Sequence, residues 1–264
     1  MIRRKVELET RFEEPGSQPG PDGNSAGFLL SAVDPLRYDG QPNDPDEVVG
    51  VVSSEIPLGA RVLDVGCGTG SVSIQIVANR RASLVGLEPD EMRARRARER
   101  GLTVWTSVLT ADVIAQLGQF DVVLLADVLE HLPDPFSVLQ LAKAALTPEG
   151  RIVASVPNVA HWSVRTELAK GRFSYRDCGI MDATHLRWFT EATLRLLFQT
   201  AGLTIESLNV TAGFDLQCYS ERLPWRRMSR QSRNAVIRRA LIAWPRLFGC
   251  QFVVRARRVA EFGS

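Results

Sequence analysis

The stretch Val62-Leu63-Asp64-Val65-Gly66-Cys67-Gly68-Thr69-Gly70 decides the fold of this chain. Its first half places apolar residues around one carboxylate, which is typical of a parallel strand that is buried on both faces. Its second half alternates three glycines, and glycine lets the backbone take positive φ and approach a bound molecule closely. Such a turn at the carboxyl end of the first strand of an α/β unit indicates a ligand site.

Apolar runs and helix-compatible runs alternate on both sides of this turn. We expect strands at 62–65, 83–88, 102–107, 120–125, 150–156, 203–210 and 251–257, and helices at 44–55, 71–80, 91–100, 135–146 and 191–201. This alternation predicts a doubly wound, mostly parallel seven-stranded α/β sheet. The last two strands can pair antiparallel, which predicts an antiparallel strand at the sheet edge.

Composition divides the chain into four parts. Residues 1–30 are rich in Gly, Pro and Ser and predict a flexible leader. The core follows at 31–210, with an aromatic, partly helical lid inserted at about 158–190. A basic helical segment with the final edge strand occupies residues 211–258. We interpret residues 259–264 as a tail or cloning scar.

Three observations predict a soluble protein of the reducing cytoplasm. No run of eighteen apolar residues could form a membrane span. The charged N-terminus lacks the apolar core of a signal peptide. The four cysteines are widely scattered, without the paired spacing of a metal site.

Two acids flank the glycine turn where a nucleoside ligand would need them. Asp64 lies inside the first strand, and a carboxylate there is costly unless it is satisfied. Glu88 ends the second strand, where a carboxylate can accept hydrogen bonds from both ribose hydroxyls.

These residues carry a family resemblance. The segments 64–70, 88–90 and 120–123, together with Asp127-Val128-Leu129-Glu130-His131-Leu132-Pro133-Asp134-Pro135, resemble the class I S-adenosylmethionine-dependent methyltransferases, which have a Rossmann-like sheet. The resemblance spans about residues 45–210. It implies S-adenosylmethionine as cofactor, S-adenosylhomocysteine as product, and the glycine turn as the cradle of the methionine and ribose parts.

The resemblance also implies a set of cofactor-binding residues. They are Asp64, Gly66, Cys67, Gly68, Gly70, Glu88, Pro89, Ser107, Val108, Leu109, Ala126, Asp127 and His131. Glu88 inherits the ribose contact, and 107–109 would flank adenine. The family often has an acid at the position of Ser107, and Asp112 could substitute for it.

A dinucleotide site is the rival interpretation of a glycine-rich turn. Such sites favour a wider spacing of the third glycine, so that a helix N-terminus meets a pyrophosphate. Asp64 lies two residues before the turn and would repel a pyrophosphate. It suits a cofactor that bears an ammonium and a sulfonium.

The lid segment 170–190 is similar to a segment of bacterial methyltransferases in sugar, surface-polysaccharide and natural-product pathways. This similarity implies O-methylation of a hydroxyl on a sugar-containing or other small-molecule acceptor. Direct displacement needs alignment of the acceptor and removal of its proton. His185 is the first candidate base, because a histidine can be neutral at cellular pH. Asp182 could orient it or act alone, and His161 is the second candidate base.

The same residues allow other interpretations of the site and of the reaction. Asp182 and His185 could simply tie down the lid backbone. Asp127, Glu130 and Asp182 could offer oxygen ligands to a divalent ion, but their spacing does not demand one, and we expect no metal. N- or C-methylation of a natural product is an alternative reaction. A catalytically idle cofactor-binding subunit is an alternative of a different class.

The C-terminal segment is strongly basic. From Tyr219 to Arg258 there are eleven arginines and one acid, Glu221, although the whole chain has a net charge of only +2. The segment 222–246 could lie on an anionic membrane as an amphipathic helix, bind a phosphorylated substrate, or pack on the domain with its arginines solvated. No recognisable nucleic-acid module accompanies it, so nucleic acid is not an expected partner.

Overall fold

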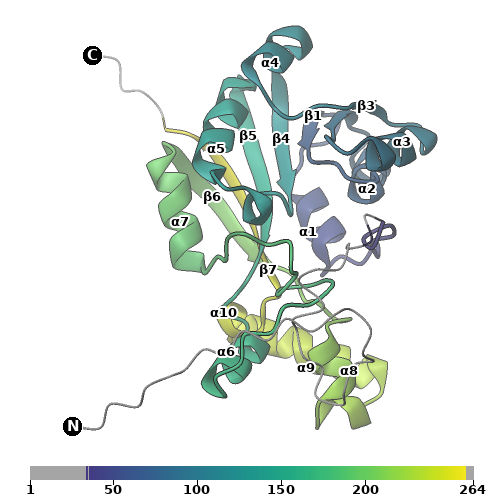
Figure 1. The fold of residues 1–264 in the computed structure, drawn as a ribbon, viewed down its shortest axis with the longest axis vertical. Helices are drawn as coiled ribbons and strands as arrows, with labels where there is room; N and C mark the ends of the chain where they lie inside the picture. The colour runs from purple at the N-terminus through teal and green to yellow at the C-terminus, as the bar shows by residue number, and fades with distance from the viewer. Residues whose placement is uncertain (1–33, 35, 260–264) are drawn as a thin grey trace, which may run out of the picture.

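The protein is described by a computed structural model that covers residue 34 and residues 36–259. The predicted leader at 1–30 and residues 260–264 of the predicted tail lie outside the described residues. The described chain forms a layered α/β domain with a group of short helices beneath it (Figure 1).

Seven strands form one sheet in the order β3-β2-β1-β4-β5-β7-β6. Their bounds are β1 Arg61–Val65, β2 Ser83–Leu87, β3 Thr103–Trp105, β4 Phe120–Ala126, β5 Leu146–Pro157, β6 Leu203–Val210 and β7 Gln251–Arg258. The five strands β3, β2, β1, β4 and β5 pair in parallel with one another. The central strands are apolar because both of their faces are covered. The predicted doubly wound, mostly parallel sheet is confirmed.

Helices cover both faces of this sheet (Figure 1). On one face pack α1 (Val48–Ser54), α2 (Ser71–Arg80) and α3 (Glu91–Glu99), whose apolar side chains share one core cluster with the sheet. The opposite face is covered by α4 (Ala111–Leu117), α5 (Pro135–Ala144) and α7 (Glu191–Thr200). The helix α4 was not predicted, because it is short and buries only Val113.

The position of the final strand differs from the prediction. We expected this strand at the sheet edge, but β7 lies between β5 and β6 and is antiparallel to both. Phe252, Val253, Val254 and Ala256 are buried, which suits an inner strand, whereas β6 alternates between exposed and covered residues as an edge strand does. β7, which is antiparallel to both of its neighbours, therefore lies inside the sheet next to the edge strand, and the edge strand is β6.

The predicted lid and the predicted basic segment pack together. The lid contains α6 (Trp162–Ala169), and the basic segment contains α8 (Gln217–Glu221), η3 (Trp225–Arg227), α9 (Arg230–Ala243) and α10 (Pro245–Phe248). The ring of Trp162 lies 5.9 Å from that of Tyr219 and 6.2 Å from that of Trp225. We call these five helices the cap lobe. It lies beyond the carboxyl ends of β4 and β5 (Figure 1).

The helix expected in the basic segment is α9, which has 14 residues. Ile237 and Ala240 are its buried residues, so one side of the helix packs on the lobe. Pro245 begins the separate short helix α10. Within the described part of the chain, no helix is both long and apolar enough to cross a bilayer.

Candidate active site

The turn between β1 and α2 has a left-handed backbone. Gly66, Gly68 and Gly70 have φ angles of 73°, 55° and 75°. The N–H of Gly66 donates to the carbonyl oxygen of Leu87 at 2.7 Å, which fixes the turn against the end of β2. Residues with a β-carbon are strained at such angles, which explains the alternating glycines.

The three glycines have different surroundings. A β-carbon on Gly66 would lie 2.9 Å from Cγ2 of Val128, and one on Gly70 would lie 2.5 Å from Cδ1 of Leu102. A β-carbon on Gly68 would meet no atom within 4 Å. The side of the turn next to Gly68 is therefore open, and a ligand can approach the backbone there.

The side chain of Cys67 points away from this open side. Cys67 is buried, and a β-carbon on Gly86 would lie 2.6 Å from its sulfur atom. Burial raises the pKa of the Cys67 thiol. Cys67 can therefore contribute its backbone to a ligand, while its side chain belongs to the core.

Asp64 connects β1 to α2. Its Oδ2 accepts a hydrogen bond of 2.6 Å from the hydroxyl of Ser73, and the residue is only 2% exposed. Burial raises the pKa of Asp64 to about 6; the Ser73 hydrogen bond opposes this shift and the neighbouring Glu88 adds to it. A contact between Asp64 and the cofactor stays a prediction.

Glu88 connects the glycine turn to the start of α3. Its Oε2 accepts from the N–H of Gly68 at 2.9 Å, and its Oε1 accepts from the N–H of Asp90 at 3.0 Å. A carboxylate has about four acceptor positions, so each oxygen can still accept a hydrogen bond from a hydroxyl group. The ribose role predicted for Glu88 fits this placement.

The residues predicted to flank adenine lie in the loop after β3. Val108 is exposed, and Ser107 is half-buried and donates its hydroxyl to the carbonyl of Val108 at 3.0 Å. Leu109 is buried and belongs to the main core cluster. Pro89 is exposed beside Glu88, and the substitute acid Asp112 is exposed in the first turn of α4.

Asp127 follows Ala126 at the end of β4 and has a φ of 54°, which is uncommon for a residue other than glycine. Its N–H donates to the hydroxyl of Ser155 at 3.0 Å. Its Oδ1 accepts from that hydroxyl at 2.7 Å and from the amide of Gln251 at 2.9 Å. Burial raises the pKa of Asp127, and these two hydrogen bonds oppose the shift. The carboxylate is thus tied to β5 and β7.

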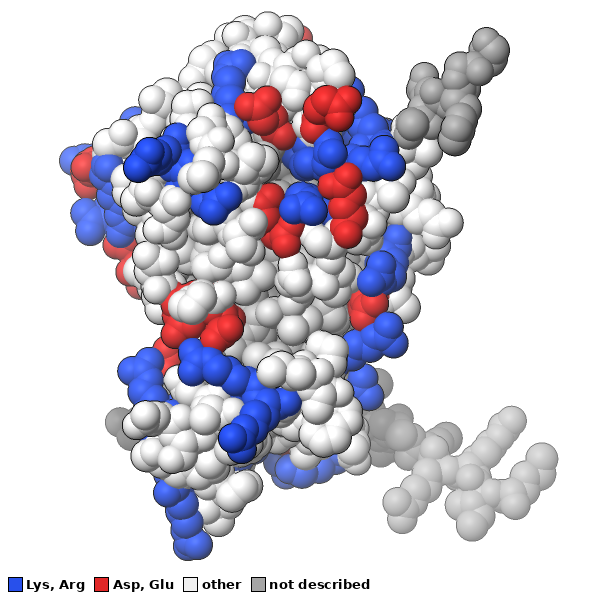
Figure 2. All heavy atoms as spheres, turned by 180° about the vertical axis from the view of Figure 1, so that it is seen from behind, with Lys and Arg blue, Asp and Glu red and all other residues white. Residues whose placement is uncertain are grey.

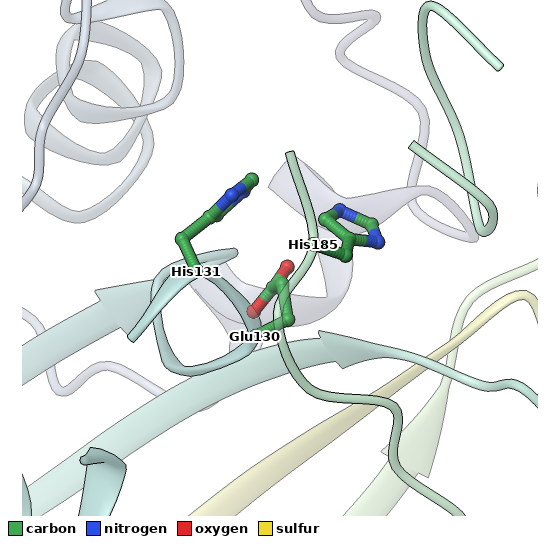
Figure 3. A group of neighbouring side chains, drawn as sticks. All are labelled: Glu130, His131 and His185. Atoms are coloured by element: carbon green, nitrogen blue, oxygen red, sulfur yellow. The ribbon is translucent and has the colours of Figure 1, made fainter. Parts of the chain in front are cut away.

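Glu130, His131 and His185 form a cluster beside the end of β4 (Figure 3). The first two come from η2 (Leu129–His131) and the third from the lid. One ligand atom from each of the three side chains lies within 4.8 Å of the other two. The two imidazole rings meet edge to face with centroids 4.9 Å apart. The cluster could therefore hold a metal ion, and the expected absence of a metal remains a prediction.

The protonation of the two histidines follows from their partners. Nδ1 of His185 lies 3.1 Å from the carbonyl of Ile180, and Nδ1 of His131 lies 3.2 Å from the carbonyl of Thr184. A carbonyl only accepts, so each Nδ1 carries the hydrogen and each neutral ring has a lone pair on Nε2. Burial lowers the pKa of both rings, and that of His185 falls to about 4. Both rings are therefore neutral at neutral pH.

Glu130 is the least satisfied member of this cluster. It is 1% exposed, and both of its carboxylate oxygens lack a hydrogen-bond partner among the described residues. Burial raises the pKa of Glu130 well above its ordinary value, and the charge of Asp127 adds to the shift. An unpaired buried carboxyl is costly, so its presence here points to a ligand or a proton that it binds during function.

The structure does not support a catalytic role for Asp182. Its carboxylate accepts from Arg37, from the hydroxyl of Tyr38 at 2.7 Å and from the hydroxyl of Thr184 at 2.6 Å. Burial raises the pKa of Asp182, but these hydrogen bonds outweigh it and hold the pKa below its ordinary value. The His185 ring donates to Ile180 instead, so Asp182 does not orient that ring. Asp182 anchors the lid to the segment around Arg37.

His161 also has a structural position. It is the N-cap of α6, with Nδ1 2.8 Å from the hydroxyl of Ser163 and Nε2 3.3 Å from that of Tyr219. The ring is fully buried, which lowers its pKa to about 3. Both ring nitrogens have hydrogen-bond partners within the protein. His161, the second candidate base, therefore serves as the N-cap of α6.

A cavity of about 130 Å³ is lined by α6, by lid residues 172–181 and by residues 215–222, which include α8. Its lining is mixed: apolar side chains such as Phe173, Ile180 and Met181 lie beside charged ones, which are Glu167, Arg172, Arg176, Asp215, Glu221 and Arg222. Ile180 also accepts the His185 hydrogen bond, so the cavity adjoins the cluster. Glu130, His131 and His185 are not among the residues that line the cavity.

Three residues of the site were not selected from the sequence as binding or catalytic groups. Glu130 was considered only as a possible metal ligand, although its place next to His131 in the resemblance motif was the available signal. Arg37 and Tyr38 precede the first predicted helix, and nothing in their local pattern marks them. Only the folded lid brings Asp182 to them.

Residues 41–208 match the family described as "Methyltransferase domain". The chain is also 36% identical over 135 residues to a protein of Pseudomonas aeruginosa (strain LESB58) named "Ubiquinone biosynthesis O-methyltransferase", a match that covers 49% of this chain and 53% of that protein. A protein of the same name from Xanthomonas axonopodis pv. citri (strain 306) is 32% identical over 183 residues, covering 63% of this chain and 72% of its own. The chain thus spans about half the length of the first of these relatives.

Two solved structures share the fold. A "SAM dependent methyltransferase from Archaeoglobus fulgidus" superposes with a TM-score of 0.53 at 18% identity, covering 88% of this chain and 100% of that one. An "S-adenosylmethionine dependent methyltransferase from Mesorhizobium loti" gives a TM-score of 0.51 at 19% identity, covering 79% and 96%.

Proposed function

Because this chain belongs to the class I S-adenosylmethionine-dependent methyltransferases, we propose that it methylates a hydroxyl oxygen of a small-molecule acceptor. The observation that carries the proposal is the Glu130–His131–His185 cluster, with its unpartnered carboxyl and its two neutral rings. The name of the relatives in Pseudomonas and Xanthomonas, an O-methyltransferase, supports oxygen as the methylated atom.

The residues around the glycine turn fit the cofactor. Gly68 leaves the backbone open on one side, and Glu88 retains acceptor positions for the two ribose hydroxyls. When bound, S-adenosylmethionine supplies an electrophilic methyl group on a sulfonium. The task of the remaining residues is to align the acceptor oxygen with that group and to remove its proton.

His185 is the proposed proton acceptor. Its Nε2 has a free lone pair because Nδ1 donates to Ile180, so it could take the proton of the acceptor hydroxyl while the oxygen receives the methyl group that bound S-adenosylmethionine would supply. The resulting imidazolium would lie beside Glu130, and its positive charge would favour ionisation of that carboxyl, so that the two opposite charges stabilise each other.

The strength of this base bears on the acceptor class. A histidine with a pKa of about 4 is a weak base, so it suits a relatively acidic hydroxyl such as a phenol. A sugar hydroxyl, the acceptor class expected from the lid segment, is less acidic and would need more help from Glu130. We therefore rank a phenolic acceptor first and a sugar hydroxyl second, with the cavity beside Ile180, where Phe173 and Met181 also lie, as the binding site for the acceptor.

Two measurements test the proposal. Calorimetry with S-adenosylhomocysteine should detect binding, and no binding at millimolar concentration would refute the methyltransferase assignment. A screen of phenols, sugars and amines with S-adenosylmethionine should then yield a product that gains one methylene in mass. Methylation of nitrogen or carbon alone would refute the choice of oxygen. Cofactor binding without turnover on any acceptor would favour an idle binding subunit.

A divalent ion in the cluster is the second candidate for activating the hydroxyl. One carboxylate and two imidazoles are a reasonable ligand set for a transition metal. We expect activity to survive dialysis against a chelator, as the sequence indicated. Loss of activity that a divalent ion restores would assign the cluster to a metal instead of to proton transfer.

A further inference from the structure

Helix α9 exposes large apolar side chains to solvent. Ile242 is 85% exposed, Trp244 at its C-cap is 61% exposed, and Val236 is 39% exposed. A single exposed apolar residue on a surface is ordinary, but three within nine positions of one segment need an explanation.

The geometry of the helix puts these residues on one side. Val236, Arg239 and Ile242 are three residues apart, which places them along one stripe of an α-helix. The buried residues of α9, Ile237 and Ala240, point to the other side. The helix therefore packs on the rest of the cap lobe with one face and exposes Val236, Arg239 and Ile242 on another, where Ile242 also lines a groove that contains Asp46, Glu55 and Glu191.

The same region carries arginines without acidic partners. Arg226 and Arg227 of η3 lie just before α9, and Arg239 lies on its outward side; all three are exposed. None of them forms an ion pair with a described residue. Arg238, in contrast, binds Asp46 at 2.5 Å. Figure 2 shows blue side chains on the lower lobe, while most of the red ones lie above it.

We propose that this surface, the α9 face, docks on a bilayer that contains anionic lipids. We use this name for Val236, Arg239 and Ile242 on the exposed side of α9 together with the exposed residues that flank the helix in the sequence, Arg226, Arg227 and Trp244. An amphipathic helix that is rich in arginine and carries Trp and aliphatic residues on its outer side suits the boundary between lipid headgroups and acyl chains. The arginines attract the negative surface, and Ile242 and Trp244 enter the apolar region.

Other occupants fit the α9 face less well. A second copy of the chain would bring the same unpaired arginines against one another, and like charges repel. A nucleic acid would satisfy the arginines but would leave Ile242 and Val236 facing a polar backbone. A bilayer satisfies both kinds of side chain, so a lipid surface is the partner that the observations favour.

The docking would bring the proposed acceptor site close to the lipid. The cap lobe lies beyond the carboxyl ends of β4 and β5, where Asp127 and the Glu130 cluster are (Figure 1). A hydroxylated acceptor carried by a membrane lipid would then reach the site without leaving the bilayer. This consequence rests on the proposed function, whereas the docking itself does not.

Flotation of the full chain with vesicles tests the docking. We expect binding to vesicles of phosphatidylcholine with phosphatidylglycerol, and little binding to phosphatidylcholine alone. The double variant Arg226→Glu/Arg227→Glu should weaken binding at least about tenfold. The double variant Ile242→Ser/Trp244→Ser should weaken it similarly at unchanged net charge.

A matched control separates the α9 face from overall charge. Arg95→Glu reverses an exposed arginine on α3 and should leave vesicle binding within about twofold, whereas the single variant Arg226→Glu, with the same change in net charge, should weaken it more. Equal binding to both vesicle types, or an equal loss for Arg95→Glu, would overturn the proposal. So would binding to single-stranded DNA in place of vesicles. Each variant is also titrated with S-adenosylhomocysteine, so failure of docking is distinguishable from failure of the proposed function.

Discussion

Arg37 and Asp182 are 145 positions apart in the chain and form a buried ion pair. Nη2 of Arg37 lies 2.9 Å from Oδ2 of Asp182, and their side chains are 12% and 0% exposed. The residues that follow Arg37 contact the start of α2, next to the glycine turn. The N–H groups of Gly40 and Gln41 donate to the hydroxyl of Ser71 at 3.2 and 2.8 Å. Residues 37–41 thus link the lid to the first residue of α2.

Removing Arg37 should destabilise the protein strongly. Arg37→Ala leaves the buried Asp182 carboxylate without its cation, and such a loss costs about 3 kcal/mol of unfolding free energy. Urea unfolding followed by circular dichroism measures the change. Arg95→Ala breaks the exposed pair with Glu99 and should cost less than about 0.5 kcal/mol. Equal losses in the two variants would contradict the role given to Arg37.

Gly68→Ala should weaken cofactor binding much more than it weakens folding. The added methyl group would enter the open side of the glycine turn, so we expect the dissociation constant of S-adenosylhomocysteine to rise at least about tenfold. The left-handed φ should cost roughly 1 kcal/mol of stability.

Gly59 provides the matched control for this variant. It has a φ of 73° and no atom within 4 Å of a β-carbon, but it precedes β1 and lies outside the turn. Gly59→Ala should cost similar stability and leave cofactor affinity unchanged. Equal cofactor affinity in the two variants would show that the space beside Gly68 does not hold the ligand.

Glu88→Gln should reduce cofactor affinity about tenfold or more. The amide NH₂ of glutamine cannot accept, so it would face the N–H of Gly68 or of Asp90 and lose one of the two present hydrogen bonds. Calorimetry with S-adenosylhomocysteine measures the effect. Asp90→Asn removes a charge two residues away and keeps the N-cap of α3, so its affinity should stay near that of the parent. An unaffected Glu88→Gln variant would exclude the ribose contact.

His185→Ala should lower kcat by about 10²- to 10⁴-fold, as expected for loss of a general base, and leave cofactor affinity nearly unchanged. A base acts in its neutral form, and the pKa of His185 is about 4. The acid limb of the rate profile should therefore lie near pH 4, and the rate should stay level from pH 7 to about 5. An acid limb near pH 6.5, or full activity of the His185→Ala variant, would contradict a catalytic role for His185.

His161→Asn should change how stability depends on pH. The folded-state pKa of about 3 lies below the ordinary 6.5, so the unfolded chain takes up a proton first as the pH falls. The parent therefore loses stability from pH 6.5 downward, and asparagine, which can also cap α6, removes that loss. Relative to the parent, the variant should gain about 2 kcal/mol between pH 6.5 and pH 5. If the free energy of unfolding of the two proteins changed with pH in parallel, this prediction would be contradicted. The kcat of His161→Asn should stay near the parent value.

The sheet and the cofactor side of the site could be predicted because their signals are local. Apolar runs such as Val122 to Leu125 mark strands, and the alternating glycines from Gly66 to Gly70 mark the turn. The position of Glu88 beside the turn could be predicted because its distance from the glycines follows from the length of one helix and one strand, while its contact with ribose stays a prediction. These patterns depend on neighbouring residues, so a single sequence carries them.

The rest depends on contacts between distant parts of the chain. Asp182 was expected beside the His185 ring, but its partner is Arg37, 145 positions away. His161 was expected at the rim of the active site, but Tyr219, 58 positions away, covers it. A histidine that caps a helix and a histidine that accepts a proton look alike in sequence. Their burial and their partners distinguish them.

The insertion of β7 between β5 and β6 also has a consequence for biosynthesis. Among the described residues, β6 pairs with β7 alone, and residues 211–250 separate the two strands in the sequence. A nascent chain that has emerged only as far as residue 250 presents β6 without a partner and β5 with a bare edge, both of which invite pairing with other chains. Because β7 is the described partner of β6, this edge of the sheet can form only after residues 251–258 have been synthesised.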